Sequence, residues 1–356
     1  MDEHSLREKR KDEHVKLALQ TDFVSDSDFD DLFFIHRSFP EAGIKDISLK
    51  TKLGSLSLDC PIYINAMTGG SKKTEIINAS LAEAARETGV AIAVGSQHAG
   101  IRNESLAGTY SVVRKKNPKG LVFANVGADV PIEFAKRAID MLEADALQIH
   151  LNVPQELVMP EGEREFTGLL GKVEKMVEAI SIPVIVKETG FGISAETLLE
   201  LKNIGVHYVD LGGRGGTNFI QIENERRSKR DYSYLKEWGQ STPISLMEAQ
   251  QFLNDMIIMA SGGIRNPLDA AKCLTLGAKA VGIARPFLKA LHSNGVAGLV
   301  EELNDWKDHL KMILLMQGSR TITELHECPI MVTKAVREWC ELREINIQRL
   351  AMRKKI

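Results

Sequence analysis

Short runs of apolar residues recur along the chain, and each run is followed by a polar or glycine-rich segment. There are eight such runs: "IYINAM" from Ile62, "VAIAVGS" from Val90, "LVFANVG" from Leu121, "ALQIHLN" from Ala146, "IPVIVKE" from Ile182, "VHYVDLGG" from Val206, "IIMASGG" from Ile257 and "KAVGIAR" from Lys279. Their starts are mostly about 22 to 36 residues apart, the spacing of a strand followed by a helix. Because the runs are continuously apolar, we expect strands that are covered on both faces.

The segments between these runs have the spacing of amphipathic helices. The stretch "TEIINASLAEAARETG" from Thr74 is an example, with Gly89 as a stop signal. Eight strand–helix units predict the α/β class and a (β/α)₈ TIM barrel. We expect one domain, with an N-terminal extension over residues 1–60, the barrel over 61–292 and C-terminal helices over 293–356. A polar and aromatic insertion between Gly212 and about Thr242 is expected to form a lid or an oligomer contact.

Charge and composition exclude several classes of protein. The chain has 45 basic and 48 acidic residues, interspersed, so neither nucleic acid nor a membrane surface is an expected partner. No apolar run approaches the roughly 18 residues of a membrane span, and the charged N-terminus is unlike a secretory signal, so we expect a cytoplasmic protein. The cysteines are scattered and contain no C-x-x-C pair, which indicates neither a zinc cage nor a disulfide framework: Cys60, Cys273, Cys328 and Cys340.

The ends of the seventh and eighth strands carry the strongest local signal. Active sites of such barrels form where the carboxyl ends of the strands meet. Gly262 and Gly263 allow a close approach of the backbone, helices beginning near Pro267 and Pro286 direct free N–H groups at the same place, and Arg265 adds a cation. The pattern favours a phosphate site, although tight turns alone would also use these residue types.

Two further strand ends carry unusual polar groups. The fourth strand ends in "HLNVPQE", which brings together His150, Asn152, Gln155 and Glu156. The fifth ends in Lys187, and a buried lysine is costly unless it faces an anionic or electron-rich group. An ion pair with a neighbouring carboxylate is the alternative for this lysine, and a satisfied core histidine is the alternative for His150.

Taken together, these strand ends resemble those of the FMN-dependent barrel oxidoreductases and, more closely, of type 2 isopentenyl-diphosphate isomerases. The similarity runs over nearly the whole chain: "RKDEH", "NAMTGG", "GSQ", "NVG", "HLN" with "QE" and "PEGEREF", "VKETGFGIS", "GGTNF", "SGGIRNP" and "GIARPFL". The segment "HLNVPQELVMPEGEREF" separates this family from the hydroxy-acid oxidases, whose catalytic histidine pattern is absent here.

The resemblance implies an FMN site across the barrel mouth. Its flavin ring would be lined by Ala66, Met67 and Thr68 and hydrogen-bonded by Ser96 and Asn125, with Lys187 at the N1/O2 edge. A fixed cation at that edge would stabilise the negative charge of reduced flavin. The resemblance places the phosphate among Thr217, Gly263, Ile264, Arg265, Ala284 and Arg285.

The resemblance also implies the residues that meet the substrate. Its diphosphate would be bound by Arg10, Lys11 and His14 and, after the second strand, by Ser96, Gln97 and His98. His98 stands where many relatives have arginine, so this contact is expected to depend on pH. His150, Asn152 and Gln155 would contact the substrate, and Glu156 would bind a Mg²⁺ that bridges to the diphosphate.

The expected reaction is a 1,3-allylic proton shift between isopentenyl and dimethylallyl diphosphate. No pair of strand-end side chains offers a matched acid and base, since Gln155 is an amide and Glu156 is assigned to metal. We therefore expect reduced FMN to act as the acid–base group with Gln155 beside it, after reduction by NADPH. The resemblance also implies a homotetramer or homo-octamer. Two alternatives are an FMN-dependent oxidoreductase of hydroxy acids or nucleotides and a non-catalytic barrel that binds phosphate ligands.

Overall fold

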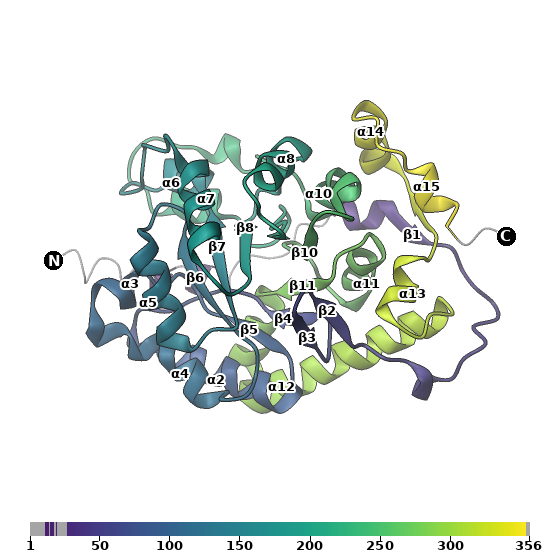
Figure 1. Cartoon of the computed structure of the whole chain (residues 1–356), viewed down its shortest axis with the longest axis horizontal. Helices are drawn as coiled ribbons and strands as arrows, with labels where there is room; N and C mark the ends of the chain where they lie inside the picture. The colour runs from purple at the N-terminus through teal and green to yellow at the C-terminus, as the bar shows by residue number, and fades with distance from the viewer. Residues whose placement is uncertain (1–10, 14, 18, 20–26, 354–356) are drawn as a thin grey trace.

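Eight parallel strands close into a barrel, as predicted (Figure 1). The computed structural model describes residues 11–13, 15–17, 19 and 27–353. The barrel strands are β4 (Ile62–Ile64), β5 (Ala91–Ala93), β6 (Val122–Gly127), β7 (Ala146–Leu151), β8 (Val184–Glu188), β9 (Tyr208–Asp210), β10 (Ile257–Ser261) and β11 (Ala280–Ile283). Each of the eight apolar runs contains one of them, and β11 pairs with β4 to close the ring.

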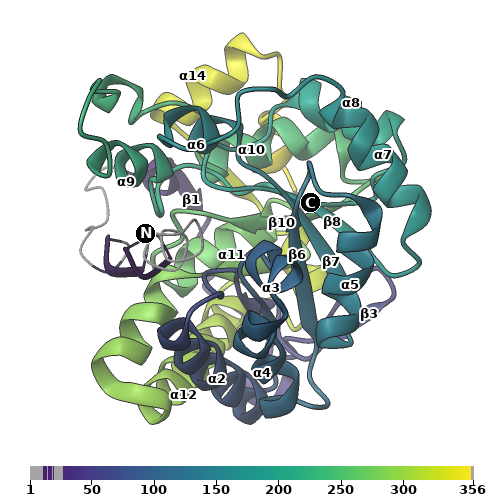
Figure 2. The ribbon, with the colours of Figure 1, turned by 90° about the vertical axis from the view of Figure 1, so that its left-hand side faces the viewer.

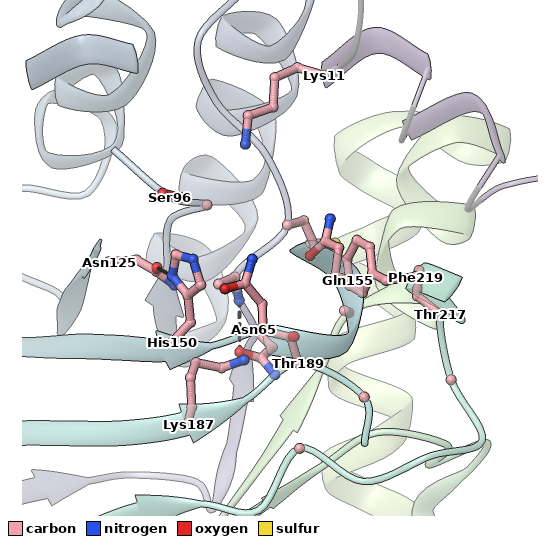
Figure 3. Close-up of a pocket in the computed structure, with 18 of the residues that line it drawn as sticks. Lys11, Asn65, Ser96, Asn125, His150, Gln155, Lys187, Thr189, Thr217 and Phe219 are labelled. Carbon is pink, nitrogen blue, oxygen red and sulfur yellow. Dashed lines mark hydrogen bonds between the residues drawn. The ribbon is translucent and has the colours of Figure 1, made fainter. Parts of the chain in front are cut away.

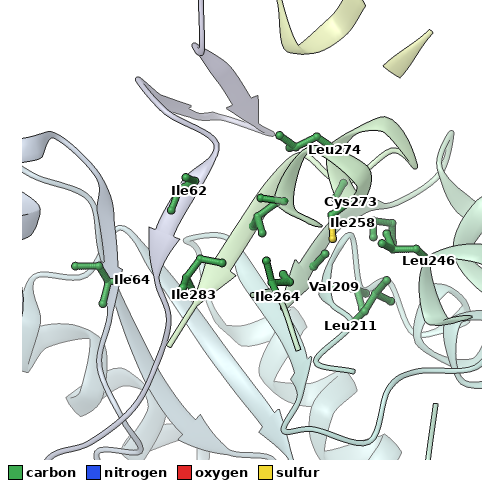
Figure 4. Close-up of a cluster of buried hydrophobic side chains, with 14 of the residues drawn as sticks. Ile62, Ile64, Val209, Leu211, Leu246, Ile258, Ile264, Cys273, Leu274 and Ile283 are labelled. Carbon is green, nitrogen blue, oxygen red and sulfur yellow. The ribbon is translucent and has the colours of Figure 1, made fainter. Parts of the chain in front are cut away.

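Alternate residues of the strands face the inside of the barrel. Tyr63, Phe123, Ile185 and Met259 pack together in its interior and are fully buried. The residues between them face outward into a second and larger core beneath the helices. Figure 4 shows part of that core between the strands and the helices around them, with Ile62, Ile258 and Leu274 among its members. Burial on both faces explains why the strands read as continuous apolar runs.

Helices cover the outside of the barrel. They are α2 (Lys72–Thr88), α4 (Gly108–Lys116), α5 (Ile132–Leu142), α7 (Leu169–Ala179), α8 (Ala195–Asn203), α10 (Thr242–Glu248), α11 (Pro267–Thr275) and α12 (Arg285–Met316). Ser71 caps the start of α2 by accepting a hydrogen bond from the Thr74 amide, and Gly89 ends it in a left-handed conformation. The stop predicted at Gly89 is therefore confirmed.

The chain outside the barrel contains strands that the sequence pattern does not predict. The hairpin of β2 (Thr51–Leu53) and β3 (Leu56–Leu58) places Leu53 and Leu58 in the barrel interior. Strand β1 (Leu32–Phe34) pairs antiparallel with β12 (Ile330–Val332), and in Figure 1 the purple segment at β1 lies near the yellow C-terminal helices. The C-terminal part is thus not purely helical, although it also contains α13 (Ile322–His326), α14 (Lys334–Leu342) and α15 (Gln348–Ala351).

Short helices surround the carboxyl ends of the strands. These are α3 (His98–Arg102), α6 (Val153–Val158) and α9 (Phe219–Glu225), the last within the predicted insertion. Val158 of α6 and Ile220 of α9 pack with Phe191 in a small core of their own, and Figure 2 shows the two helices next to each other. The remaining short turns are 3₁₀ helices: η1 (Asp28–Asp31), η2 (Ile44–Asp46), η3 (Glu104–Leu106), η4 (Ser233–Leu235) and η5 (Ala249–Phe252). Among the described helices, none has the length and apolar character needed to cross a membrane.

Candidate active site

A cavity of about 1350 Å³ opens at the carboxyl ends of the barrel strands. Its wall brings together most of the predicted site residues: Lys11, Ala66, Met67, Ser96, His98, Asn125, His150, Asn152, Gln155, Glu156, Lys187, Thr217, Gly263, Ile264, Ala284 and Arg285. Figure 3 shows side chains of the N-terminal segment, of β7 and β8 and of the loops beyond them converging on one space. Residues that lie far apart in the sequence therefore share one site.

His150 stands at the end of β7 with its ring held by Asn125. The ring Nδ1 lies 2.8 Å from Asn125 Oδ1, and Asn125 in turn donates from Nδ2 to Gln148 Oε1 over 3.1 Å. Burial lowers the pKa of His150 to about 3, and the charges of Lys187, Lys11 and His98 act in the same direction. His150 is therefore a neutral imidazole near pH 7 that contacts Asn125 on one side and lines the cavity on the other.

Helix α6 carries Gln155 and Glu156 into the cavity wall. Glu156 Oε1 accepts a hydrogen bond of 2.8 Å from Asn152, and its Oε2 accepts one of 2.9 Å from the Glu163 amide. In the described part of the chain, no cluster of three or more His, Cys, Asp or Glu residues is arranged to hold a metal ion. A divalent cation here would thus take one carboxylate from the protein and further oxygens from ligand and water, a usual arrangement for Mg²⁺.

Gln155 has a partner that the sequence analysis missed. Its Nε2 donates to Glu223 Oε1 over 2.9 Å, and Glu223 is fully buried on α9. Arg226 pairs with the same carboxylate and with Glu161 at 2.7 Å. A signal was present in the sequence, because Glu223 lies three residues after Ile220 and thus on the apolar face of α9.

Lys187 projects from the end of β8 into the cavity, where only 6% of it is exposed to solvent. Its Nζ donates to the main-chain carbonyl of Glu188 over 2.9 Å. Within the described residues it makes no ion pair, which disfavours the alternative of a structural salt bridge. Its charge therefore remains available to an anionic group in the cavity.

Glu188 is a second titratable group in the cavity wall that the sequence analysis did not single out. Its Oε2 accepts hydrogen bonds from the Thr189 amide at 2.6 Å and the Phe191 amide at 3.1 Å. Burial raises the pKa of Glu188 to about 8, although these amides and Lys187 oppose the shift. The carboxyl group thus shapes the loop after β8 and is mostly protonated at neutral pH.

The far end of the cavity has the features of a phosphate cradle. Helix α12 begins there, with Ala284, Arg285 and Pro286 in the wall, and among the described residues no side chain caps its first turn. The main chains of the loops after β9 and β10 lie in close contact, because a Cβ atom at Gly262 would lie only 1.9 Å from the carbonyl oxygen of Gly213. The start of the long helix and the bare loop backbone together suit an oxyanion.

Arg265 and helix α11 do not take part in this cradle. The guanidinium of Arg265 bonds both oxygens of Asp30, at 2.6 and 3.0 Å, and Asp269 at 2.8 Å. Asn266 caps α11 by accepting from the Asp269 amide. The expected cation of Arg265 is therefore engaged by Asp30 of η1 and by Asp269, and the start of α11 is capped by Asn266, so neither is directed at the cavity.

Two other predicted residues lie behind the cavity wall. Gln97 is fully buried and donates from Nε2 to the Ala138 carbonyl while accepting from the Asn125 amide, each over 2.9 Å. Thr68 is 2% exposed, and its main-chain carbonyl accepts from the Gly95 amide. Gln97 thus joins α5 to the strand β6 through its side chain, Thr68 joins the loop after β4 to that after β5 through its main chain, and neither residue lines the cavity. Arg10 and His14 lie outside the described residues.

Cations gather at the mouth of the cavity. Lys11 reaches in from the N-terminal segment, and residues 13 and 15–17 line the same side (Figure 3). His98 and Arg102 follow from the two ends of α3, and both belong to the wall. Arg102 was not predicted; its signal was its position one helical turn after His98.

Comparisons with known proteins agree with this geometry. An isopentenyl-diphosphate delta-isomerase of Staphylococcus aureus (strain JH9) is 50% identical to the chain over 343 residues, which are 96% of this chain and 98% of the relative. The corresponding protein of Staphylococcus aureus (strain Newman) is 49% identical over the same length. The chain belongs to the isopentenyl-diphosphate delta-isomerase family. The resemblance stated from the strand-end motifs is thereby confirmed.

Two further comparisons show that this member of the isomerase family is similar to flavin-dependent enzymes. A family model described as FMN-dependent dehydrogenase matches residues 163–331. Among solved structures, a flavocytochrome b2 mutant with benzoylformate aligns with a TM-score of 0.64 at 18% identity, over 88% of this chain and 81% of that one. A mandelate oxidase mutant with an FMN adduct aligns with a TM-score of 0.62 at 16% identity, over 90% and 92%. At this low identity the two structures establish the shared fold.

Proposed function

We propose that the protein interconverts isopentenyl diphosphate and dimethylallyl diphosphate with FMN as its cofactor. The observation that carries the proposal is that one cavity contains a backbone phosphate cradle at one end and the side chains of Lys11, His98 and Arg102 at its mouth. The buried amine of Lys187 and the amide of Gln155 lie between them (Figure 3). A flavin phosphate and a substrate diphosphate would need two such separate anion sites.

The residues present fit FMN. The N–H groups at the start of α12 and the bare backbone at Gly263 and Ile264 would hold its phosphate, with Thr217 and Arg285 in the same wall. Ala66 and Met67 would line the ring, and Lys187 would face its electron-rich edge. Reduced FMN, when bound, would supply the acid–base chemistry of the proton shift. NADPH is the reductant we propose.

The mouth of the cavity would bind the substrate diphosphate. Lys11, His98 and Arg102 bring charge from two separate segments, and Asn152 and His150 continue the polar wall inward. Glu156 would share a Mg²⁺ with the diphosphate oxygens. We propose that Arg10 and His14 add to this group. Fixing the diphosphate at the mouth would hold the alkene end deeper in the cavity, near Gln155 and Lys187.

Gln155 would orient the reacting groups or relay a proton through a bound water. Its hydrogen bond to Glu223 fixes the direction in which the amide points. Because an amide is too weak an acid or base to act alone, its part is one of placement. Closure of the N-terminal segment over the mouth would exclude bulk water from the proton transfers.

One experiment tests the proposal. The purified protein is incubated anaerobically with FMN, NADPH, Mg²⁺ and isopentenyl diphosphate, and dimethylallyl diphosphate is measured. We expect turnover that needs both FMN and a reductant but consumes no stoichiometric NADPH. Absence of product, or net oxidation of reductant matched to substrate, would contradict the proposal and favour a binding protein or an oxidoreductase.

We also propose that the chain assembles into a homotetramer or homo-octamer. The insertion after β9 exposes Tyr234 by 74% and Trp238 by 59%, which suits a contact between copies. Light scattering coupled to size exclusion gives the mass in solution. Alanine at both positions should lower that mass if the insertion forms the contact.

A further inference from the structure

Polar side chains form a series inside the barrel, beneath the cavity. Hydrogen bonds join His150 to Asn125 and Asn125 to Gln148, and another joins Tyr63 on β4 to Asp210 on β9. Between these two parts, Gln148 Nε2 lies beside the Tyr63 oxygen without a hydrogen bond of ordinary geometry. Tyr63, Gln148 and Asp210 are fully buried, and Asn125 is 3% exposed. A buried polar series of this length in a barrel core is costly unless its hydrogen bonds are satisfied.

Asp210, at the end of the series, fixes the direction of the hydrogen bond between Tyr63 and Asp210. Tyr63 donates from its hydroxyl to Asp210 Oδ2 over 2.7 Å. The other oxygen, Oδ1, accepts from the Ser261 hydroxyl at 2.7 Å and from the Gly212 amide at 3.3 Å. Burial raises the pKa of Tyr63 well above its ordinary value, as does the charge of Asp210, so the phenol keeps its proton. The Tyr63 oxygen is then left as an acceptor for the next group.

Each later member takes its orientation from the one before it. The amide nitrogen of Gln148 faces the Tyr63 oxygen and lowers the pKa of that phenol, although it makes no hydrogen bond of ordinary geometry. Gln148 thereby turns its carbonyl toward Asn125, whose Nδ2 donates to it. The carbonyl of Asn125 then faces His150, and a carbonyl can only accept. The Nδ1 atom of His150 must therefore carry the ring proton.

We propose that Tyr63 and Asp210 are positioning residues that fix the tautomer of His150, with the proton on Nδ1 and a bare Nε2 for the ligand. His150 has one ring proton near neutral pH, so the partners of its ring, Asn125 and the main chain of Val126, decide which nitrogen meets the substrate. The consequence for catalysis rests on the proposed isomerase function, whereas the tautomer itself does not. Neither Tyr63 nor Asp210 lines the cavity, so both act through Gln148 and Asn125.

The tautomer can be read directly by NMR. The full-length protein is labelled with ¹⁵N-histidine and loaded with FMN, and long-range ¹H–¹⁵N spectra show which ring nitrogen is protonated. The chain has nine histidines, so a His150→Gln variant assigns the signal. We expect the Nδ1–H form in the native protein. In Tyr63→Phe, which removes both the donor to Asp210 and the acceptor for Gln148, we expect the Nε2–H form to appear.

A matched control is available on β9. Tyr208 also lies in the barrel interior, but its hydroxyl is next to Gly54 of the β2–β3 hairpin, at the opposite end from the cavity. Tyr208→Phe removes the same atom and should leave the His150 signal unchanged. If the native protein shows the Nε2–H form, or if Tyr63→Phe leaves the tautomer as it was, the proposal is overturned. Gln148→Met interrupts the series next to Tyr63 and gives the same test should Tyr63→Phe not fold.

Activity gives a second reading. We expect Tyr63→Phe to lower kcat/KM for isopentenyl diphosphate by about tenfold or more, as loss of an outer hydrogen-bond partner does at comparable sites. FMN content should stay unchanged, and Tyr208→Phe should match the native enzyme. If the native protein has no isomerase activity, the proposed function fails while the NMR result still decides the tautomer. An active enzyme in which both variants behave alike would refute the positioning role.

Discussion

The side-chain amide of Gln155 donates a 2.9 Å hydrogen bond to the carboxylate of Glu223, which lies 68 positions further along the chain. Glu223 is held in turn by Arg226, and Arg226 reaches Glu13 of the N-terminal segment at 3.4 Å. Helix α9 of the insertion is therefore joined to the cavity wall and to the segment that lies over its mouth. The insertion belongs to the active site through this contact, whatever further part it has in assembly.

Replacing Glu223 by Gln should reduce activity through Gln155. The charge that orients the Gln155 amide and balances Arg226 is lost, and a hydrogen bond to a charged group contributes about 1.5 to 3 kcal/mol. We expect kcat for the isomerisation to fall about tenfold or more, with FMN still bound. Initial rates under anaerobic conditions measure this. Glu200→Gln, at an exposed site on α8 outside the cavity wall, removes an equal charge and should have little effect; equal losses in the two variants would contradict the role of Glu223.

Lys187→Met should lower the reduction potential of bound FMN. A fixed ammonium group beside the flavin favours its anionic reduced form, and about 30 mV corresponds to 1.4 kcal/mol for a two-electron couple. We expect a fall of tens of millivolts and a large loss of isomerase activity, measured by potentiometric titration and by initial rates. Lys272 is the matched control, since it is also 6% exposed and donates to a main-chain carbonyl, that of Phe29. A similar potential in Lys187→Met and Lys272→Met would refute the assignment.

Arg102→Ala should weaken substrate binding. Arg102 lies in the cavity wall one turn after His98 and is exposed at the mouth. Loss of one charge-assisted contact to a diphosphate should raise KM about tenfold and make it less dependent on salt, while kcat changes little. Steady-state kinetics at two ionic strengths give both values. Arg86→Ala, an exposed arginine on α2 away from the cavity, should leave KM unchanged; a wild-type KM in Arg102→Ala would exclude the contact.

The sequence predicts the barrel and most of its site because both depend on local patterns. Continuous apolar runs identify every barrel strand, and the last residue of each run lies at the cavity, as the topology of the barrel requires. Long-range pairings leave no such trace. The three-residue strands β1 and β12 have no period to detect, and their residues lie about 300 positions apart. Arg265 has the right place for a phosphate ligand, but its ion pair with Asp30, 235 residues away, can be seen only in the folded chain.

Glu188 should make the stability of the protein fall as pH rises from about 4.5 to about 8. Its folded-state pKa of about 8 lies above the ordinary value of 4.5, because burial disfavours the charged carboxylate. The folded state thus holds a proton that the unfolded state releases, and the stabilisation is present below pH 4.5 and lost as pH rises through 8. His150 and His326 change the stability in the opposite direction, since burial lowers their pKa values to about 3 and about 4, and their effect is confined to pH below about 6.5.

Between pH 6.5 and 8, therefore, the urea concentration at the unfolding midpoint of the native protein should decrease, and Glu188→Gln should remove a large part of that decrease. Glu178→Gln, at an exposed site on α7, should keep the native slope. An unchanged slope in Glu188→Gln would show that the carboxyl at the end of β8 is already ionised at neutral pH.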